Sequence, residues 1–94
     1  MVKLNFQHFS IPTGISRKKR QTGDARESFA DVIYLNVNGI KAHALAMKIY
    51  ESEGKTEYSE EEVNIIKNVA ERLCPPNFID GLMEQIEEQL TKNE

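Results

Sequence analysis

The 94-residue chain has few of the features that mark secreted, disordered or membrane-spanning proteins. Its single cysteine, Cys74, cannot form a disulfide within the chain, so we expect a reducing compartment, most simply the cytoplasm. Three prolines and five glycines are too few for a wholly disordered chain. No apolar run approaches the roughly 20 residues that span a bilayer. Polar residues from Lys3 to His8 interrupt the first apolar residues, so we also expect no secretory signal.

The formal net charge of −3 conceals a polarity along the chain. Residues 1–50 contain eight Lys or Arg against three Asp or Glu, whereas residues 51–94 contain four against twelve. Such a polarity can bias how the two halves pack, pair copies of the chain head to tail, or present a basic face to an anionic partner. It is equally compatible with two solvated faces that bind nothing.

The N-terminal residues predict a β-strand or hairpin. Over 2–11, VKLNFQHFSI, apolar and polar residues alternate at first, which is the period of a half-buried strand. The alternation slips near His8, where we expect a bulge or the end of the strand. After the turn signal at 12–14, residues 15–21 are either a second strand or a solvated basic arm. A lone hairpin is marginal in water, so its apolar face must dock on the helices or on another chain.

Residues 25–37 and 40–52 predict a pair of helices. Asp24 and Glu27 form a capping-box pattern at the start of the first helix, and Asn38-Gly39 provides a left-handed stop after it.

A rival interpretation places a β-hairpin over residues 32–41. Residues 32–37 are rich in strand formers, and Asn-Gly is a strong hairpin signal. The run that follows, AHALAMK at 42–48, is a poor returning strand and a good helix. We therefore favour the helical pair.

Two further helices are predicted over about 60–73 and 77–91. Ser59 and Glu62 form a capping box at the start of the first, and the prolines after Cys74 end it. Gly81 costs the last helix about 1 kcal/mol relative to alanine, so we expect a close helix–helix contact there. The buried stripe of the third helix is expected to comprise Val63, Ile66, Ala70 and Leu73.

Side chains that carry catalysis are scarce. The sequence has no glycine-rich phosphate loop, no paired-cysteine motif and no zinc-binding His-Glu-x-x-His pattern. The spacing of His8, His43 and Cys74 does not support a metal site. Cys74 follows a helix C-terminus, where the helix dipole disfavours a thiolate, so a small buried apolar residue is the better interpretation. We therefore expect that the protein is not an enzyme and that it binds neither a cofactor nor a metal ion.

One basic segment suggests an anionic partner. Four adjacent cations with a fifth nearby could neutralise several phosphates and bind nucleic acid without sequence preference. The candidate residues are Arg17, Lys18, Lys19, Arg20 and Arg26. No aromatic residues interleave with them, and the protein as a whole is acidic, so a solvated loop explains them equally well. Without a basic amphipathic helix, we expect no membrane binding.

Apolar residues at the two ends of the chain are candidates for contacts with a protein partner or a second copy. The first strand could add to the edge of another sheet, and the last helix could lay its apolar stripe in a groove. Docking within the chain's own fold is at least as good an explanation. The candidate residues are Leu4, Phe6, Ile79, Leu82, Ile86 and Leu90.

Several stretches resemble a group of small accessory proteins of gut-bacterial prophages and conjugative elements. These stretches are LNFQHF (4–9), DARESFAD (24–31), HALAMKIY with SEG (43–50 and 52–54) and CPPNFIDG (74–81). The group has no established activity. The resemblance implies an accessory role in a mobile element, for example in the assembly of a particle or complex.

The sequence thus predicts one mainly α domain over 1–94. An extended strand and basic arm is expected over 1–23, and a compact bundle of about four helices over 24–91. The expected function is that of a non-catalytic accessory protein acting through protein–protein contacts in assembly or regulation of a mobile element. The alternative is nucleic-acid binding through Arg17–Arg20.

Overall fold

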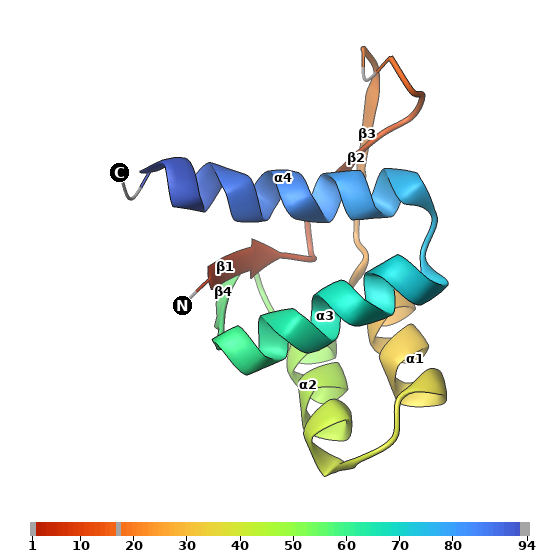
Figure 1. Cartoon of the computed structure of the whole chain (residues 1–94), viewed down its shortest axis with the longest axis vertical. Coiled ribbons are helices and arrows are strands. Elements are labelled where there is room, and N and C mark those ends of the chain that lie inside the picture. Colours follow the sequence, from red (N-terminus) through yellow and green to blue (C-terminus); the bar gives the residue numbers. More distant parts are fainter. Residues whose placement is uncertain (1, 17, 93–94) are drawn as a thin grey trace.

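The computed structural model describes residues 2–16 and 18–92, with side chains up to Glu88. It confirms a mainly α fold of four helices with short antiparallel strand pairs. The elements in chain order are β1 (Val2–Asn5), β2 (Phe9–Pro12), β3 (Arg20–Gly23), α1 (Arg26–Asn36), α2 (Ile40–Glu51), β4 (Lys55–Tyr58), α3 (Glu60–Leu73) and α4 (Pro76–Lys92). Helices α1 and α2 lie side by side, and α3 crosses them. Helix α4 lies on the opposite side of β1 from α3 (Figure 1).

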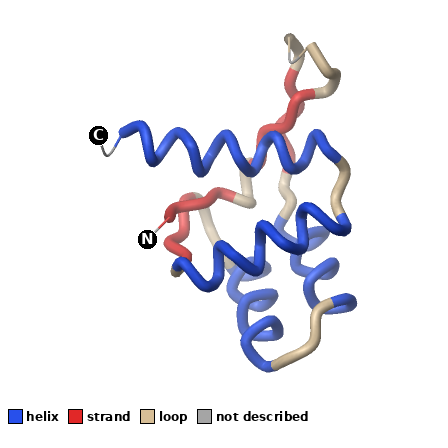
Figure 2. The backbone as a smooth tube through the Cα atoms, in the orientation of Figure 1, coloured by secondary structure: helices blue, strands red, loops and turns tan. Residues whose placement is uncertain are grey.

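The predicted strand 2–11 is divided in two, and its halves have different partners. Strand β1 pairs with β4, whereas β2 pairs with β3, both antiparallel. Between them, the Asn5 side-chain oxygen accepts a hydrogen bond from the His8 N–H at 2.9 Å, which holds a tight turn. The slip of the alternation at His8 therefore marks the end of a strand. Figure 2 shows the two separate strand pairs.

The hairpin has a second strand, later in the chain than predicted. Strand β3 begins at Arg20, and the described residues 15, 16, 18 and 19 belong to the connection instead. The hairpin β2–β3 projects from the body of the protein beside α4 (Figure 1). Strand β4 was not predicted from the sequence.

The α1–α2 pair confirms the helical interpretation of residues 32–41, but its caps differ from those predicted. The residue before α1 is Ala25, which makes no side-chain capping bond. The carboxylate of Asp24 instead accepts from the N–H of Arg26 at 3.0 Å and from its guanidinium at 2.7 Å. Gly39, with φ of 111°, directly precedes α2 and is not the C-terminal stop of α1. The predicted Asp24–Glu27 capping box is therefore wrong.

Helix α3 has the capping box that the sequence predicts. The Ser59 hydroxyl accepts from the Glu62 N–H at 3.2 Å, and the Glu62 carboxylate accepts from the Ser59 N–H at 2.8 Å. The helix spans 60–73 as predicted, with Val63, Ile66 and Ala70 buried. Leu73 is an exception. It is the last residue of the helix and is 48% exposed.

Gly81 makes a close contact, but with a strand and not with a helix. A Cβ at this position would lie 2.6 Å from the backbone oxygen of Ser10 and 3.0 Å from the side chains of Phe9 and Ile11. The absence of a side chain therefore lets α4 lie directly on β2. The predicted helix–helix contact is wrong in its partner.

Stacked aromatic rings occupy the centre of the core. Phe6 stacks on Phe29 with ring centroids 5.3 Å apart, and Phe9 stacks on Phe78 at 4.6 Å. The buried Phe6, from the turn after β1, thus joins the strands to α1, and Phe9 joins β2 to α4. Within the described residues, no helix is long and apolar enough to cross a bilayer.

Candidate functional site

The residues with reactive side chains lie apart. In the part of the chain that the structure describes, no group of three or more His, Cys, Asp or Glu could hold a metal ion. Cys74 is partly covered at the end of α3, and burial raises the pKa of its thiol. A thiol whose pKa is raised is a poor nucleophile at neutral pH. These observations agree with a packing role for Cys74.

Two of the predicted nucleic-acid residues are occupied by contacts within the chain. Arg20 forms an ion pair with Glu84, and its Nε donates to the Ser10 hydroxyl at 2.8 Å. Arg26 donates to the Asp24 carboxylate at 2.7 Å and to the Ser52 carbonyl at 2.9 Å. The Arg26 guanidinium also holds the pKa of Asp24 below its ordinary value.

The other predicted nucleic-acid residues lie in the connection between β2 and β3. Lys18 and Lys19 are exposed there, while Arg17 lies outside the described residues. The described part of the basic segment therefore presents two exposed lysines in the connection of the projecting hairpin, while Arg20, the first residue of β3, is engaged by Ser10 and Glu84.

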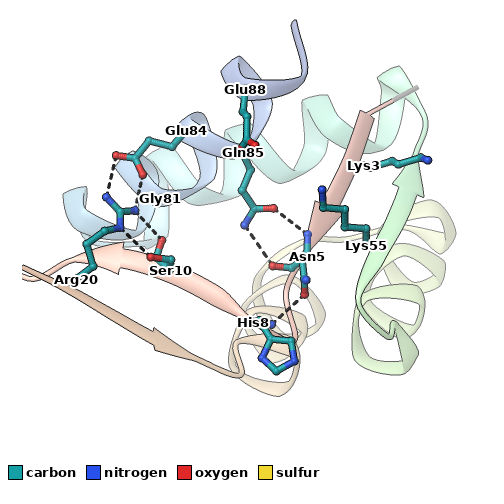
Figure 3. Close-up of a pocket in the computed structure, with 10 residues that line it drawn as sticks. All are labelled: Lys3, Asn5, His8, Ser10, Arg20, Lys55, Gly81, Glu84, Gln85 and Glu88. Atoms are coloured by element: carbon teal, nitrogen blue, oxygen red, sulfur yellow. Dashed lines mark hydrogen bonds and ion pairs between the residues drawn. The ribbon is translucent and has the colours of Figure 1, made fainter. Parts of the chain in front are cut away.

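A pocket of about 260 Å³ lies where α4 meets β1 and the hairpin (Figure 3). In it the Gln85 carboxamide accepts from the Asn5 N–H at 2.8 Å and donates to the Asn5 carbonyl at 3.2 Å, as a neighbouring strand would. The charged residues of the lining are of both signs: Lys3, Arg20, Lys55, Glu84 and Glu88. This mixture does not favour a ligand of one charge, so the pocket is best explained as the seam that joins α4 to the strands.

The residues predicted to bind a partner lie mostly in the chain's own core. This is the alternative that the sequence left open. The side chain of Ile79 is partly buried against the core, and Leu90 lies in α4 at a position whose side chain is outside the described part. The fully buried residues of this set are Leu4, Phe6, Leu82 and Ile86.

A different surface exposes large apolar side chains. A groove of about 370 Å³ runs between α1 and α2. Two buried alanines, Ala30 and Ala46, lie in it, one on each helix. The larger side chains that line it are Tyr34, His43, Met47 and Tyr50. Of these, Tyr34 is 59%, Met47 44% and Tyr50 53% exposed. We call this surface the aromatic groove.

The helical periodicity explains how the aromatic groove arises. Both helices turn their buried stripes toward the core, and these stripes contain Phe29 and Ile33 on α1 and Leu45 and Ile49 on α2. Tyr34 and Met47 lie about 100° from the neighbouring buried residues, because successive residues of a helix are rotated by that angle. Their side chains are therefore left on the outer side of the helix pair.

One end of the aromatic groove is acidic. Glu27 and Asp31 line it, and an adjoining pocket that shares Glu27 and Tyr50 adds Glu51, Glu53 and the ion pair of Asp24 with Arg26, so that carboxylates outnumber cations there. At the other end, the rings of Tyr34 and His43 are 5.7 Å apart. The surface thus combines exposed aromatic rings and a flexible thioether with a margin of carboxylates.

The aromatic groove was not predicted from the sequence. The one signal that could have indicated it is the surplus of apolar residues on 25–37 and 40–52. Once the buried stripes are assigned, Tyr34, Leu35, Ile40, Met47 and Tyr50 are left over, and all five are exposed.

Comparison of the chain with protein-family models, with curated proteins and with solved structures finds no match.

Proposed function

We propose that this chain is a non-catalytic accessory protein that acts through protein contacts, and that the aromatic groove is its contact surface. The proposal is carried by the exposure of Tyr34, Met47 and Tyr50 around one hollow between two helices that pack side by side. Tyrosine and methionine are enriched at protein interfaces. Exposed apolar patches with polar margins are typical of interaction sites.

The margin of the groove indicates the chemistry of the partner. An apolar side chain of leucine size would gain about 1.5–3 kcal/mol by full burial. Carboxylates beside the groove, from Glu27 and Asp31 to Glu51 and Glu53, favour cations next to that side chain. The expected partner segment therefore presents an aliphatic or aromatic residue flanked by lysine or arginine.

The test is the binding of a labelled peptide that carries one leucine between two pairs of lysines, measured by fluorescence anisotropy. We expect binding that weakens as salt is raised, because the carboxylate margin is exposed to solvent and screened. A Tyr34→Ala/Met47→Ala double variant should bind at least about tenfold more weakly, which corresponds to about 1.4 kcal/mol. The two side chains are exposed, so the fold should tolerate the change, and circular dichroism checks this.

Two controls distinguish binding in the aromatic groove from non-specific binding. Leu73→Ala removes an exposed apolar residue at the end of α3, outside the groove, and should bind the peptide like the wild type. A peptide with glutamates in place of the lysines should not bind. If the double variant binds the lysine peptide as tightly as the wild type does, the groove is not the contact surface.

Nucleic-acid binding is the second candidate, and Lys18 and Lys19 on the projecting hairpin are the observation that favours it. Two exposed lysines predict weak binding with a shallow dependence on salt, since few counterions are released. Titration into short duplex DNA at about 50 mM salt tests it, because electrostatic binding is strongest when screening is weak. No binding there excludes this candidate.

An accessory role in a mobile element remains part of the proposal. A protein that helps to assemble or regulate a particle or a transfer complex needs contact surfaces and does not need a catalytic site. Neighbouring genes that encode capsid, tail or conjugation parts would support this context, and neighbours of unrelated metabolism would count against it.

A further inference from the structure

The projecting hairpin carries the chemistry that the aromatic groove is expected to bind. Ile15, in the connection between β2 and β3, is fully exposed, and Lys18 and Lys19 are exposed beside it. An exposed isoleucine followed by two exposed lysines has the apolar and cationic groups of the partner segment described above. In the described part of the chain, no other exposed aliphatic residue lies on a segment that projects from the body in this way.

The hairpin is held as a defined projection. The N–H and the hydroxyl of Thr13 both donate to the Lys19 carbonyl, at 3.0 and 3.2 Å, which closes the end of the strand pair. At the first residue of β3, next to the connection, Arg20 bonds to Ser10 and pairs with Glu84 on α4. These contacts fix the strand pair that carries the connection, so less conformational entropy of that pair is lost on docking.

We infer that the aromatic groove binds the hairpin tip of a second copy of this chain, with Ile15 entering between Tyr34 and Met47 and the lysines facing the carboxylate margin. This inference rests on the proposed function. Charge complementarity favours it, because the tip presents Lys18 and Lys19 and the groove is bordered by Glu27 and Asp31.

The positions of the two surfaces determine the form of the assembly. The hairpin tip and the α1–α2 connection lie at opposite ends of the longest axis of the molecule, which is 39 Å (Figure 1). A chain therefore cannot dock its own tip in its own groove. A contact between two different surfaces is head to tail, and it repeats into a ring or an open filament.

Two variants that each lose one surface test the inference. An Ile15→Asp/Lys18→Glu variant keeps the groove and loses the tip, whereas a Tyr34→Ala/Met47→Lys variant keeps the tip and loses the groove. All four residues are exposed, so both variants should fold. At low salt the wild type should associate as concentration rises, with an average mass above the monomer's 10.8 kDa in sedimentation. Each variant alone should remain a monomer.

An equimolar mixture of the two variants should form a dimer and nothing larger, because only one intact tip–groove pair exists. A Leu73→Lys variant is the matched control and should associate like the wild type. The inference is overturned if the wild type stays a monomer at every concentration, if either variant still associates alone, or if the mixture forms no dimer. If the wild type is a monomer yet binds the lysine–leucine peptide in its groove, the proposed function stands and the inference fails. If it does neither, both fail.

Discussion

Replacing Gly81 with alanine tests how closely α4 lies on β2. In an exposed helix this change stabilises a protein by about 1 kcal/mol, because alanine has the higher helix propensity. Here the new Cβ would lie 2.6 Å from the Ser10 carbonyl oxygen. A carbon and a carbonyl oxygen in a favourable contact are about 3.3 Å apart or more. Helix or strand must therefore move by roughly 0.7 Å.

The structure resists that movement. The ion pair of Arg20 with Glu84 and the two hydrogen bonds between Gln85 and Asn5 fasten α4 to β3 and β1 about one helical turn after Gly81. The oxygen that the new Cβ would contact belongs to the backbone of Ser10, so the clash cannot be relieved by rotating a side chain. Overpacking of this kind costs about 1–3 kcal/mol, and the gain in propensity offsets about 1 kcal/mol of it. Because the contact is with a backbone atom, we take the upper part of the overpacking range, about 2–3 kcal/mol, and expect a net loss of roughly 1–2 kcal/mol.

Urea unfolding followed by circular dichroism measures this loss. The midpoint should fall without a change in slope, and the Tm should fall by about 5–15 °C for a domain of this size. Asn68→Ala on the exposed face of α3 is the control, and there a somewhat smaller gain in helix propensity, without a clash, should raise stability slightly. A Gly81→Ala protein as stable as the wild type, or more stable, would refute the close contact.

Three further predictions concern local interactions. Ser59→Ala should lower the free energy of unfolding by about 1 kcal/mol in urea denaturation, because the N-cap bond of α3 is lost. Although partial burial opposes it, hydrogen bonds from Ser59 and Lys48 hold the pKa of Glu62 below its ordinary value of 4.5. The charged Glu62 therefore stabilises the fold at pH values above 4.5. The stability difference between the wild type and Glu62→Gln should be about 0.5–1 kcal/mol there, and it should vanish as the pH falls through the lower pKa of the folded state. A stability difference that does not vary with pH would contradict this. Gln85→Ala should speed hydrogen exchange at the Asn5 amide and cost about 1 kcal/mol, and an unchanged exchange rate would count against the bond to Gln85.

Signals that act within a few residues could be read from the sequence. The Ser59–Glu62 capping box involves residues three apart, and the helix it starts has the predicted bounds. The α1–α2 pair was also predictable, since the helix-forming run at 42–48 decided against a hairpin. The predicted capping box of Asp24 with Glu27 was wrong because the Asp24 carboxylate accepts from two nearby donors on Arg26, the N–H and the guanidinium. The sequence pattern alone does not show which of the nearby donors the carboxylate will bind.

Contacts between distant residues could not be read in this way. Strand β4 forms only because β1 lies beside it, and Val2 and Tyr58 are partners 56 residues apart. The contact of Gly81 with Ser10 on β2 likewise joins residues that are far apart in the sequence. The aromatic groove also depends on long-range packing, because Tyr34 and Met47 could have been covered by α4 or by the hairpin. Only the packing of those elements elsewhere leaves the two side chains exposed.

The methyl signals of the methionines test the central claim most directly. Met47 lines the aromatic groove, while Met83 on α4 packs partly buried against the core and is a comparison within the same molecule. During titration with the lysine–leucine peptide, the carbon-13 methyl signal of Met47 should shift to saturation while that of Met83 stays in place. Binding of the peptide with Met47 unmoved would contradict the assignment of the groove as the contact surface.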